Sequence, residues 1–430
     1  MRPPETLKGE PTNDQARRDP FRSLLALSRR GGDVARYRAG AEAAFLINDP
    51  GHVKHILVDN HANYSKATVI NSLFKEAVAD GLLTSEGEDW WRQRRLMQPA
   101  FYRERVARIG DGVIEATLAM LERWEPHARS GEPLDVAAEM GSLTLRITTR
   151  ALFSVDISEH ADSLGHQIAE GLGHMIAPSH PEFVRSRARV EDTVATIIER
   201  RRHDLRAYTD LLALLLAARD QDTGEGMTDR EVRDQVITLM LAGYETTANA
   251  LCWTWCLLSQ NPRPMRVLRD EVRSVLGGRT PTVADLPRLP YNRMVLDESM
   301  RLYPPAWILG RRALADDKLG EHVIPAGSVV AMSPYAMHRN PDLWDEPEEF
   351  RPERFTREQS VGRAPFAYFP FGGGPRLCIG HNFALLEAQL ITATVAQNYE
   401  LELVPGRRVV PERLFVLRPR DGLPMMVRTA

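Results

Sequence analysis

The chain has 430 residues, of which 43% are hydrophobic and 26% are charged, and its 55 basic and 58 acidic side chains leave a net charge of -3. This is the composition of an ordinary globular protein, and the length is sufficient to enclose a large cofactor. The near balance of charge argues against nucleic acid as the main partner.

The N-terminal segment, MRPPETLKGEPTNDQARRDP, is polar and contains prolines but no apolar stretch. A signal peptide needs an apolar core and a transmembrane helix needs about 20 apolar residues, and neither pattern occurs along the chain. We therefore expect residues 1–20 to be flexible, and the protein to be cytoplasmic and without a membrane anchor.

The next part of the chain mixes helical and strand-like segments, such as residues 43–47 ahead of the turn signal Asn48-Asp49-Pro50-Gly51. From about Trp90 to Asn261 the pattern is overwhelmingly helical. Near the start of this stretch, Trp90 and Arg94 lie four residues apart and therefore share one face of their helix.

A capping-box pattern at Thr228 and Glu231 predicts the start of a long helix that ends at Asn261-Pro262, some 32 residues or about 48 Å. Its middle reads Ala-Gly-Tyr-Glu-Thr-Thr over residues 242–247, where Gly and Thr are poor helix formers. This weak point predicts a groove over a ligand. The alternative is the close approach of a second helix at Gly243.

The three cysteines, Cys252, Cys256 and Cys378, are too few for a disulfide framework and indicate a reducing compartment. Cys252 and Cys256 lie four residues apart on the long helix with no histidine nearby in the sequence. We expect both to be buried core residues and not half of a zinc site.

A further helix is predicted between Pro290 and Pro304. Glu298 falls on its apolar face, so its carboxylate should be buried, and Arg301, one turn later, can pair with it. The alternative is a solvated surface pair, because the Glu-x-x-Arg pattern also occurs at Glu182/Arg185, Glu199/Arg202 and Glu348/Arg351.

After Pro304, short apolar segments such as Val329–Met332 and Pro424–Val427 predict small sheets. No repeat or long linker divides the chain, so we expect one domain over residues 1–430, mainly α with minor β. Residues 366–380 read FAYFPFGGGPRLCIG, and the glycines and proline forbid regular structure ahead of a final helix. Cys378 therefore lies at or just before a helix N-terminus, where a thiolate is favoured and can bind a metal.

Phe371, Gly374, Arg376, Cys378 and Gly380 match the F-x-x-G-x-R-x-C-x-G signature at every fixed position, and the chain thereby resembles the cytochrome P450 superfamily. The resemblance extends over nearly the whole chain from about Phe45, with the motifs in the family's order. It implies the cytochrome P450 fold, a single triangular haem-enclosing domain, with haem b and O2 as cofactors and Cys378 as the iron ligand.

The resemblance also implies contacts with the haem. Arg94, Arg311 and Arg376 would pair with its propionates, with Arg312 as a close rival of Arg311. The other positions placed at the cofactor are Trp90, Ala242, Gly243, Phe371, Gly372, Ile379 and Gly380.

Residues 242–246 match the family motif A-G-x-[DE]-T. By resemblance, Glu245 relays protons from solvent, and Thr246 holds the water through which oxygen is protonated. Glu298 and Arg301, with Arg354 of a P-E-R-F segment, would form a structural triad that braces the haem-binding core.

Substrate-facing positions follow only from family topology, and their apolar character implies a hydrophobic small molecule. The candidates are Val69, Phe74, Leu239, Ala306, Trp307, Ile308 and Phe415.

No G-x-G-x-x-G segment opens a dinucleotide-binding unit, so electrons must come from a separate ferredoxin with its reductase, or from a flavodoxin. A basic surface for such a partner, or simply solvated helix faces, is formed by Arg92, Arg94, Arg95, Arg103, Arg105 and Arg108. We expect a monomer.

The sequence thus predicts a haem-thiolate monooxygenase that hydroxylates or epoxidises its substrate. The alternatives are a peroxide-driven peroxygenase or isomerase, a non-catalytic haem sensor or carrier, and a helical scaffold without haem. The presence of both Glu245 and Thr246 argues against the peroxide-driven enzyme, because such an enzyme can dispense with a proton relay.

Overall fold

The computed structural model describes residues 20–39, 42–154, 168, 179–202, 210–220, 224–413 and 416–430. The described residues are mostly helical with small sheets, as predicted. They form two compact units, one of residues up to 72 together with 300–378, the other of residues 73–299 together with 379–430. The single triangular domain stays a prediction, and the segment expected to be flexible lies, except for Pro20, outside the described residues.

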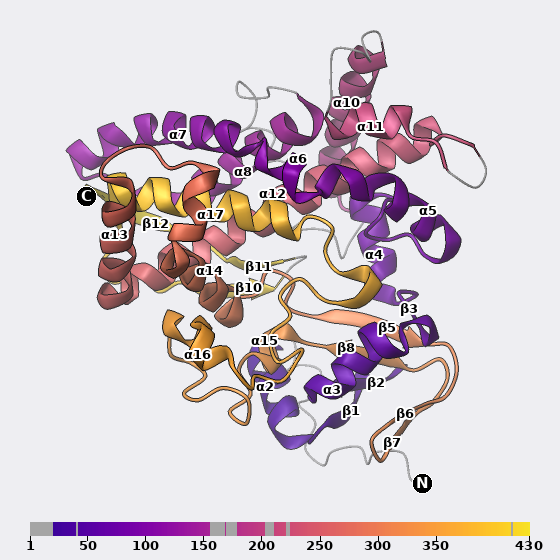
Figure 1. Cartoon of the computed structure of the whole chain (residues 1–430). Helices are drawn as coiled ribbons and strands as arrows, with labels where there is room; N and C mark the ends of the chain where they lie inside the picture. The colour runs from indigo at the N-terminus through magenta and orange to yellow at the C-terminus, as the bar shows by residue number, and fades with distance from the viewer. Residues whose placement is uncertain are drawn as a thin grey trace. The chain divides into compact units, whose positions relative to one another are not determined.

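The first unit contains most of the strands (Figure 1). Its helices are α2 (Pro20–Arg30), α3 (Pro50–Lys54), α15 (Pro334–Met337) and α16 (Arg357–Ser360), with short helical turns η1 (His55–Asp59), η2 (His61–Asn63), η6 (Pro352–Phe355) and η7 (Gly374–Arg376). Its strands are β1 (Val34–Ala39), β2 (Glu42–Ile47), β3 (Tyr64–Ser65), β5 (Leu309–Ala313), β6 (Asp317–Leu319), β7 (His322–Ile324) and β8 (Val329–Met332). Helices α4 (Val69–Val78) and α14 (Pro290–Leu302) connect this unit to the other along the chain.

Five strands of this unit form one sheet in the order β1-β2-β8-β5-β3, in which only β2 and β8 are parallel. The strands predicted at residues 43–47 and 329–332 are β2 and β8. Alternate side chains face opposite sides, since Phe45 and Ile47 pack in a cluster with Phe369, whereas Leu46 packs with α2. The sheet is therefore covered on both faces.

The second unit is predominantly helical. Its helices are α5 (Gly87–Met97), α6 (Arg103–Ala107), α7 (Gly110–Ser130), α8 (Val136–Phe153), α10 (Pro181–Arg202), α11 (Leu211–Ala217), α12 (Asp229–Gln260), α13 (Pro262–Leu276) and α17 (His381–Asn398), with short turns η3 (Gln98–Phe101) and η5 (Val283–Arg288). A sheet of β4 (Leu134–Asp135), β12 (Pro424–Thr429) and β9 (Tyr399–Leu403) and a hairpin of β10 (Pro411–Arg413) and β11 (Leu417–Pro419) complete it.

Helix α12 is the centre of this unit and contacts α8, α10, α11, α13 and α17. The predicted capping box is confirmed, because the Thr228 side chain accepts from the Glu231 amide and the Glu231 carboxylate accepts from the Thr228 amide. The helix is continuous from Asp229 to Gln260, including the segment predicted to be weak. Cys252 and Cys256 are buried in it, and burial raises the pKa of both thiols, which confirms them as core residues. No described helix has the length and hydropathy to span a membrane.

Candidate cofactor and active site

Cys378 ends an irregular loop of the first unit and precedes the first residue of α17 by three positions. Its amide donates to the Phe371 carbonyl oxygen at 3.1 Å, and the Leu377 amide donates to the Gly374 oxygen at 3.0 Å. The Cys378 side chain is exposed and forms no disulfide. The loop thus fixes the backbone of Cys378, while the residue itself stays exposed.

Two glycines of this loop have a structural reason to be glycine. Gly374 has a φ of 65°, and a Cβ at this position would overlap the carbonyl oxygen of Leu57 in η1. A Cβ at Gly373 would overlap the ring of Phe366. The glycines of the cysteine loop thus allow a close approach within the first unit, in which Gly374 lies against η1.

Arg311 and Arg312 are neighbours on β5 with different hydrogen-bond partners. Its guanidinium donates to the carbonyl oxygens of Ala67 at 2.7 Å and Gly327 at 2.6 Å, and it pairs with Glu42 at 3.0 Å. Arg311 is 8% exposed and donates to the Gly310 oxygen at 2.8 Å. The assignment of Arg311, rather than Arg312, to a propionate stays a prediction.

The predicted structural triad is buried: Glu298 and Arg301 are 0% exposed and Arg354 is 3% exposed. The alternative of a solvated pair is thereby wrong for Glu298 and Arg301. Both arginines hold one segment, residues 345–349. Arg301 donates to the oxygens of Pro347 at 2.7 Å and Glu349 at 2.9 Å, whereas Arg354 donates to the oxygens of Asp345 and Glu346.

In the second unit, residues 242–246 of α12 lie against α8. A Cβ at Gly243 would come within 2.9 Å of Thr148 Cγ2, and the Thr144 hydroxyl donates to the Tyr244 oxygen at 3.0 Å. The alternative considered for Gly243, close packing with a second helix, is therefore confirmed. The assignment of Ala242 and Gly243 to the cofactor stays a prediction.

Glu245 is 4% exposed, and its Oε2 has no hydrogen-bond partner among the described residues. Burial raises the pKa of this carboxyl to about 7, and the positive charge of Arg418 partly opposes the shift. The neighbouring Thr246 hydroxyl donates to the Ala242 oxygen at 2.8 Å, which leaves its lone pairs able to accept. A buried acid that titrates near neutrality and an accepting hydroxyl therefore lie side by side in the sequence of one helix.

The remaining predicted cofactor residues occupy two places. Trp90 is buried and Arg94 is half-buried on α5. The rings of Trp90 and Trp91 pack with 4.6 Å between their centroids. The others belong to the cysteine segment and are half-buried: Phe371, Gly372, Arg376, Ile379 and Gly380.

The predicted substrate residues do not form one group. Val69 is 65% exposed on α4, whereas Phe74 is half-buried and Leu239 is buried. Trp307 packs on Phe21 of α2, and Ile308 packs in the cluster of Leu46, so packing accounts for both side chains. Ala306 is half-buried, and Phe415 lies outside the described residues. These substrate contacts stay predictions.

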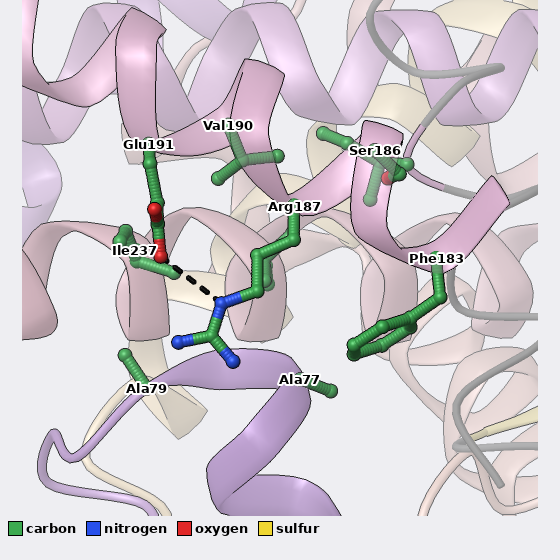
Figure 2. A pocket seen from close by; sticks show the side chains of 10 residues that line it. Ala77, Ala79, Phe183, Ser186, Arg187, Val190, Glu191 and Ile237 are labelled. Atoms are coloured by element: carbon green, nitrogen blue, oxygen red, sulfur yellow. Dashed lines mark hydrogen bonds and ion pairs between the residues drawn. The ribbon is translucent and has the colours of Figure 1, made fainter. Parts of the chain in front are cut away.

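A pocket that the sequence analysis did not find lies in the second unit (Figure 2). It is lined by Ala77, Ala79, Ile168, Phe183, Ser186, Arg187, Val190, Glu191, Ile237 and Leu241. Arg187 points into it, donates to Glu191 Oε1 at 3.0 Å and also contacts the Glu76 carbonyl oxygen. Ile237 and Leu241 precede Glu245 by eight and four residues, so all three lie along one side of α12. No local pattern distinguishes these apolar residues from core, which is why the sequence did not reveal them.

Part of the predicted basic surface is paired within the second unit. Arg92 bonds Glu231 at 2.8 Å, and Arg95 bonds the buried Asp220 at 3.1 Å. Arg95 is exposed as well, and so are Arg103, Arg105 and Arg108. Of the six arginines of the predicted basic surface, these four are exposed.

Comparisons with known proteins agree over most of the chain. A family model described as cytochrome P450 matches residues 12–423. The chain is 37% identical to cyclooctatin synthase and 36% identical to cyclooctat-9-en-7-ol 5-monooxygenase, both of Streptomyces melanosporofaciens, over 92% and 90% of this chain and 88% and 86% of those proteins. It is similar to a solved cytochrome P450DA heme domain with a TM-score of 0.88 and 28% identity, over 96% of this chain and 93% of that one.

The packing of Gly374 can be tested by substitution. We expect Gly374→Ala to destabilise the protein by more than about 3 kcal/mol in urea unfolding, because positive φ alone costs about 1–3 kcal/mol and a backbone overlap is added. Gly362→Ala is the matched control, since Gly362 also has positive φ but nothing lies within 4 Å of its Cβ position. Equal stability of the two variants would contradict the contact with Leu57.

Proposed function

Because the chain belongs to the cytochrome P450 family, we propose that Cys378 holds haem b and that the enzyme inserts one atom of O2 into a hydrophobic small molecule. Membership of the family implies a haem-iron cofactor and the use of O2, and the enzyme is a haem-thiolate monooxygenase. When bound, a haem with an anionic sulfur ligand supplies the activation of O2 and the cleavage of its O–O bond.

The exposed Cys378, whose backbone the loop holds in place, is the single observation that carries this proposal. The described residues contain no group of three or more His, Cys, Asp or Glu side chains that could hold a bare metal ion. A lone cysteine fits a metal that brings its own nitrogen ligands, as haem iron does. Of the two arginines on β5, Arg311 fits the role of propionate partner, because Arg312 is used elsewhere.

We assign the proton supply to Glu245. With a pKa of about 7, its buried carboxyl keeps a proton over much of the physiological range and can release it. The Thr246 hydroxyl, whose hydrogen is directed to the Ala242 oxygen, can accept a hydrogen bond from a water and so hold it in place. In this proposal, Glu245 donates the proton and Thr246 orients its carrier.

The substrate class is inferred from the relatives and the pocket. The names of two relatives, cyclooctat-9-en-7-ol 5-monooxygenase and pentalenene oxygenase of Streptomyces avermitilis, refer to an unsaturated alcohol and an alkene. The pentalenene oxygenase is 31% identical over 94% of this chain and 92% of that protein. The pocket beside Ile237 and Leu241 has mostly apolar walls, and its polar lining is Ser186 and the ion pair of Arg187 with Glu191. We infer a largely hydrocarbon substrate with few oxygen atoms.

The redox partner is inferred from charge. A monooxygenase of this family needs an electron donor, and we propose an acidic ferredoxin or flavodoxin that docks on Arg103, Arg105 and Arg108 of α6 and the residue after it. Arg95 is a poor probe of docking, because its loss would leave the carboxylate of Asp220 buried without this partner. A monomeric state and a cytoplasmic location remain inferences from composition and cysteine content. No observation favours the peroxide-driven, sensor or haem-free alternatives.

The ligand assignment predicts a spectrum. The ferrous protein with carbon monoxide should show the red-displaced Soret band of thiolate ligation, and Cys378→Ala should abolish it. Cys256→Ala, which removes a buried core thiol, is the control and should retain the band. A band that survives in Cys378→Ala would overturn the assignment.

Replacing the proposed proton donor should slow turnover. We expect Glu245→Gln, which keeps the size of the side chain, to lower kcat by about a hundredfold. The wild-type rate should fall as the pH rises above about 7, because the acid form of Glu245 is then lost, and the variant should lack this dependence. The exposed Glu122→Gln on α7 serves as the control; an unchanged rate in Glu245→Gln would assign the relay to another group.

The docking surface predicts a salt-dependent effect. Arg105→Glu should slow reduction by an acidic ferredoxin by roughly tenfold at low ionic strength, and the difference should shrink as salt screens the charges. Stopped-flow reduction is the measurement. The same charge reversal at the exposed Arg266 of α13 is the control, and equal rates for both variants would remove the proposed surface.

A further inference from the structure

His338 is completely buried in the first unit and takes no part in the chemistry proposed above. It caps the C-terminal end of α15, and an imidazole inside a protein core needs polar partners. Its contacts connect two parts of the chain that the sequence analysis treated separately, the Glu298–Arg301 helix and the cysteine loop.

The ring and the backbone of His338 make different bonds. Its Nε2 accepts a hydrogen bond of 3.0 Å from the amide of Phe369, which is itself buried in the core on the sheet. Its carbonyl oxygen accepts a bond of 2.7 Å from Arg301 Nη1. His338 therefore joins α14 to the segment that leads to the cysteine.

From Phe369 the connection continues through the backbone. The Phe369 oxygen accepts from the Gly372 amide at 3.0 Å, and the Phe371 oxygen accepts from the Cys378 amide at 3.1 Å. Through its bond to the Phe369 amide, the His338 side chain therefore holds the turn that leads to Cys378. All of these bonds lie within one unit of the structure.

The bond to Phe369 defines the charge of the ring. Because Nε2 accepts, the imidazole must be neutral with its proton on Nδ1, which has no hydrogen-bond partner among the described residues. The surroundings oppose a second proton, since the positive charges of Arg301 on α14 and of the adjacent Arg339 act on the ring. Burial, and then these charges, hold the pKa of His338 well below its usual range.

The other neighbours of the ring that the structure describes include three aromatic side chains. They are the aromatic rings of Trp344 at 6.4 Å, Tyr368 at 5.0 Å and Phe369 at 5.5 Å between centroids, and Arg363 stacks on the Trp344 ring. Glu348 is paired with Arg339 at 3.1 Å. An imidazolium would therefore meet two guanidinium charges and a donor amide, an unfavourable setting that backbone bonds to Arg301 and Met300 only partly oppose.

We propose that His338 is a positioning residue for Cys378, in which the neutral imidazole anchors the Phe369 amide and thereby the loop that carries the sulfur. The proposal rests on the proposed function only in naming the haem iron as what the sulfur binds. Protonation of the ring turns its acceptor into a donor and releases the Phe369 amide. The anchor is then lost, and the ligand moves.

Two substitutions separate anchoring from simple filling of space. His338→Gln places an amide oxygen near the position of Nε2 and cannot titrate in this range, whereas His338→Met fills similar volume without a strong acceptor. Hydrogen–deuterium exchange of the Phe369 amide in the holoprotein is the first readout. We expect exchange to be at least about tenfold faster in His338→Met than in the wild type, and largely restored to slow exchange in His338→Gln.

The second readout is an acid titration of the ferrous carbon monoxide spectrum. The folded wild-type protein disfavours the protonated ring, so stability is retained above the unfolded-state pKa near 6.5 and is lost progressively as the pH falls below it. The thiolate band of the wild type should therefore disappear on acidification at a higher pH than that of His338→Gln. A role in packing alone does not produce this difference.

Superimposable acid titrations of the wild type and His338→Gln would overturn the proposal, as would unchanged exchange at Phe369 in His338→Met. If His338→Met does not fold, the proposal is still tested by comparing the pH dependence of Phe369 amide exchange between the wild type and His338→Gln. The exchange readout does not involve the cofactor, so a wild-type protein without the thiolate band would refute the proposed function separately.

Discussion

The loop that carries Cys378 contains no strand and no helix longer than the single turn η7, so its conformation depends on individual backbone contacts. Gly374 lies against the Leu57 carbonyl, and the amide of Cys378 is bonded to the Phe371 oxygen. A metal ligand must be held within about 0.5 Å of its working position. Every chemical step proposed for this enzyme therefore requires that an irregular segment behave as a rigid one.

Buried arginines provide much of that rigidity. A guanidinium has five donors in one plane and can bond several carbonyl oxygens that no strand or helix satisfies. Arg301 and Arg354 together bond carbonyls at Asp345, Glu346, Pro347 and Glu349, in a stretch without regular secondary structure. These side chains take the place of hydrogen bonds that a sheet would supply, which explains why they are fully buried despite their charge.

Local patterns in the sequence were sufficient to predict the long helix with its Thr228 cap, the cysteine loop and the burial of Glu298 and Arg301. Each depends on residue types at short spacing, where periodicity and turn chemistry act directly. The sequence could not show that Thr148 packs on Gly243, that Arg312 rather than Arg311 is tied to Glu42, or that His338 accepts from Phe369. These contacts join residues 31 to 270 positions apart, and only the folded chain brings them together.

The two arginines of β5 show how neighbouring residues of a pleated strand come to have different contacts. Consecutive side chains leave opposite faces of a sheet, so Arg311 and Arg312 meet different surroundings. A slip of one position in the strand pairing would exchange those surroundings. Pairing on both flanks, with β3 at Ser65 and Tyr64 and with β8 from Val329 to Met332, prevents such a shift. The alignment of this short strand thus determines which of two identical side chains meets Ala67, Gly327 and Glu42.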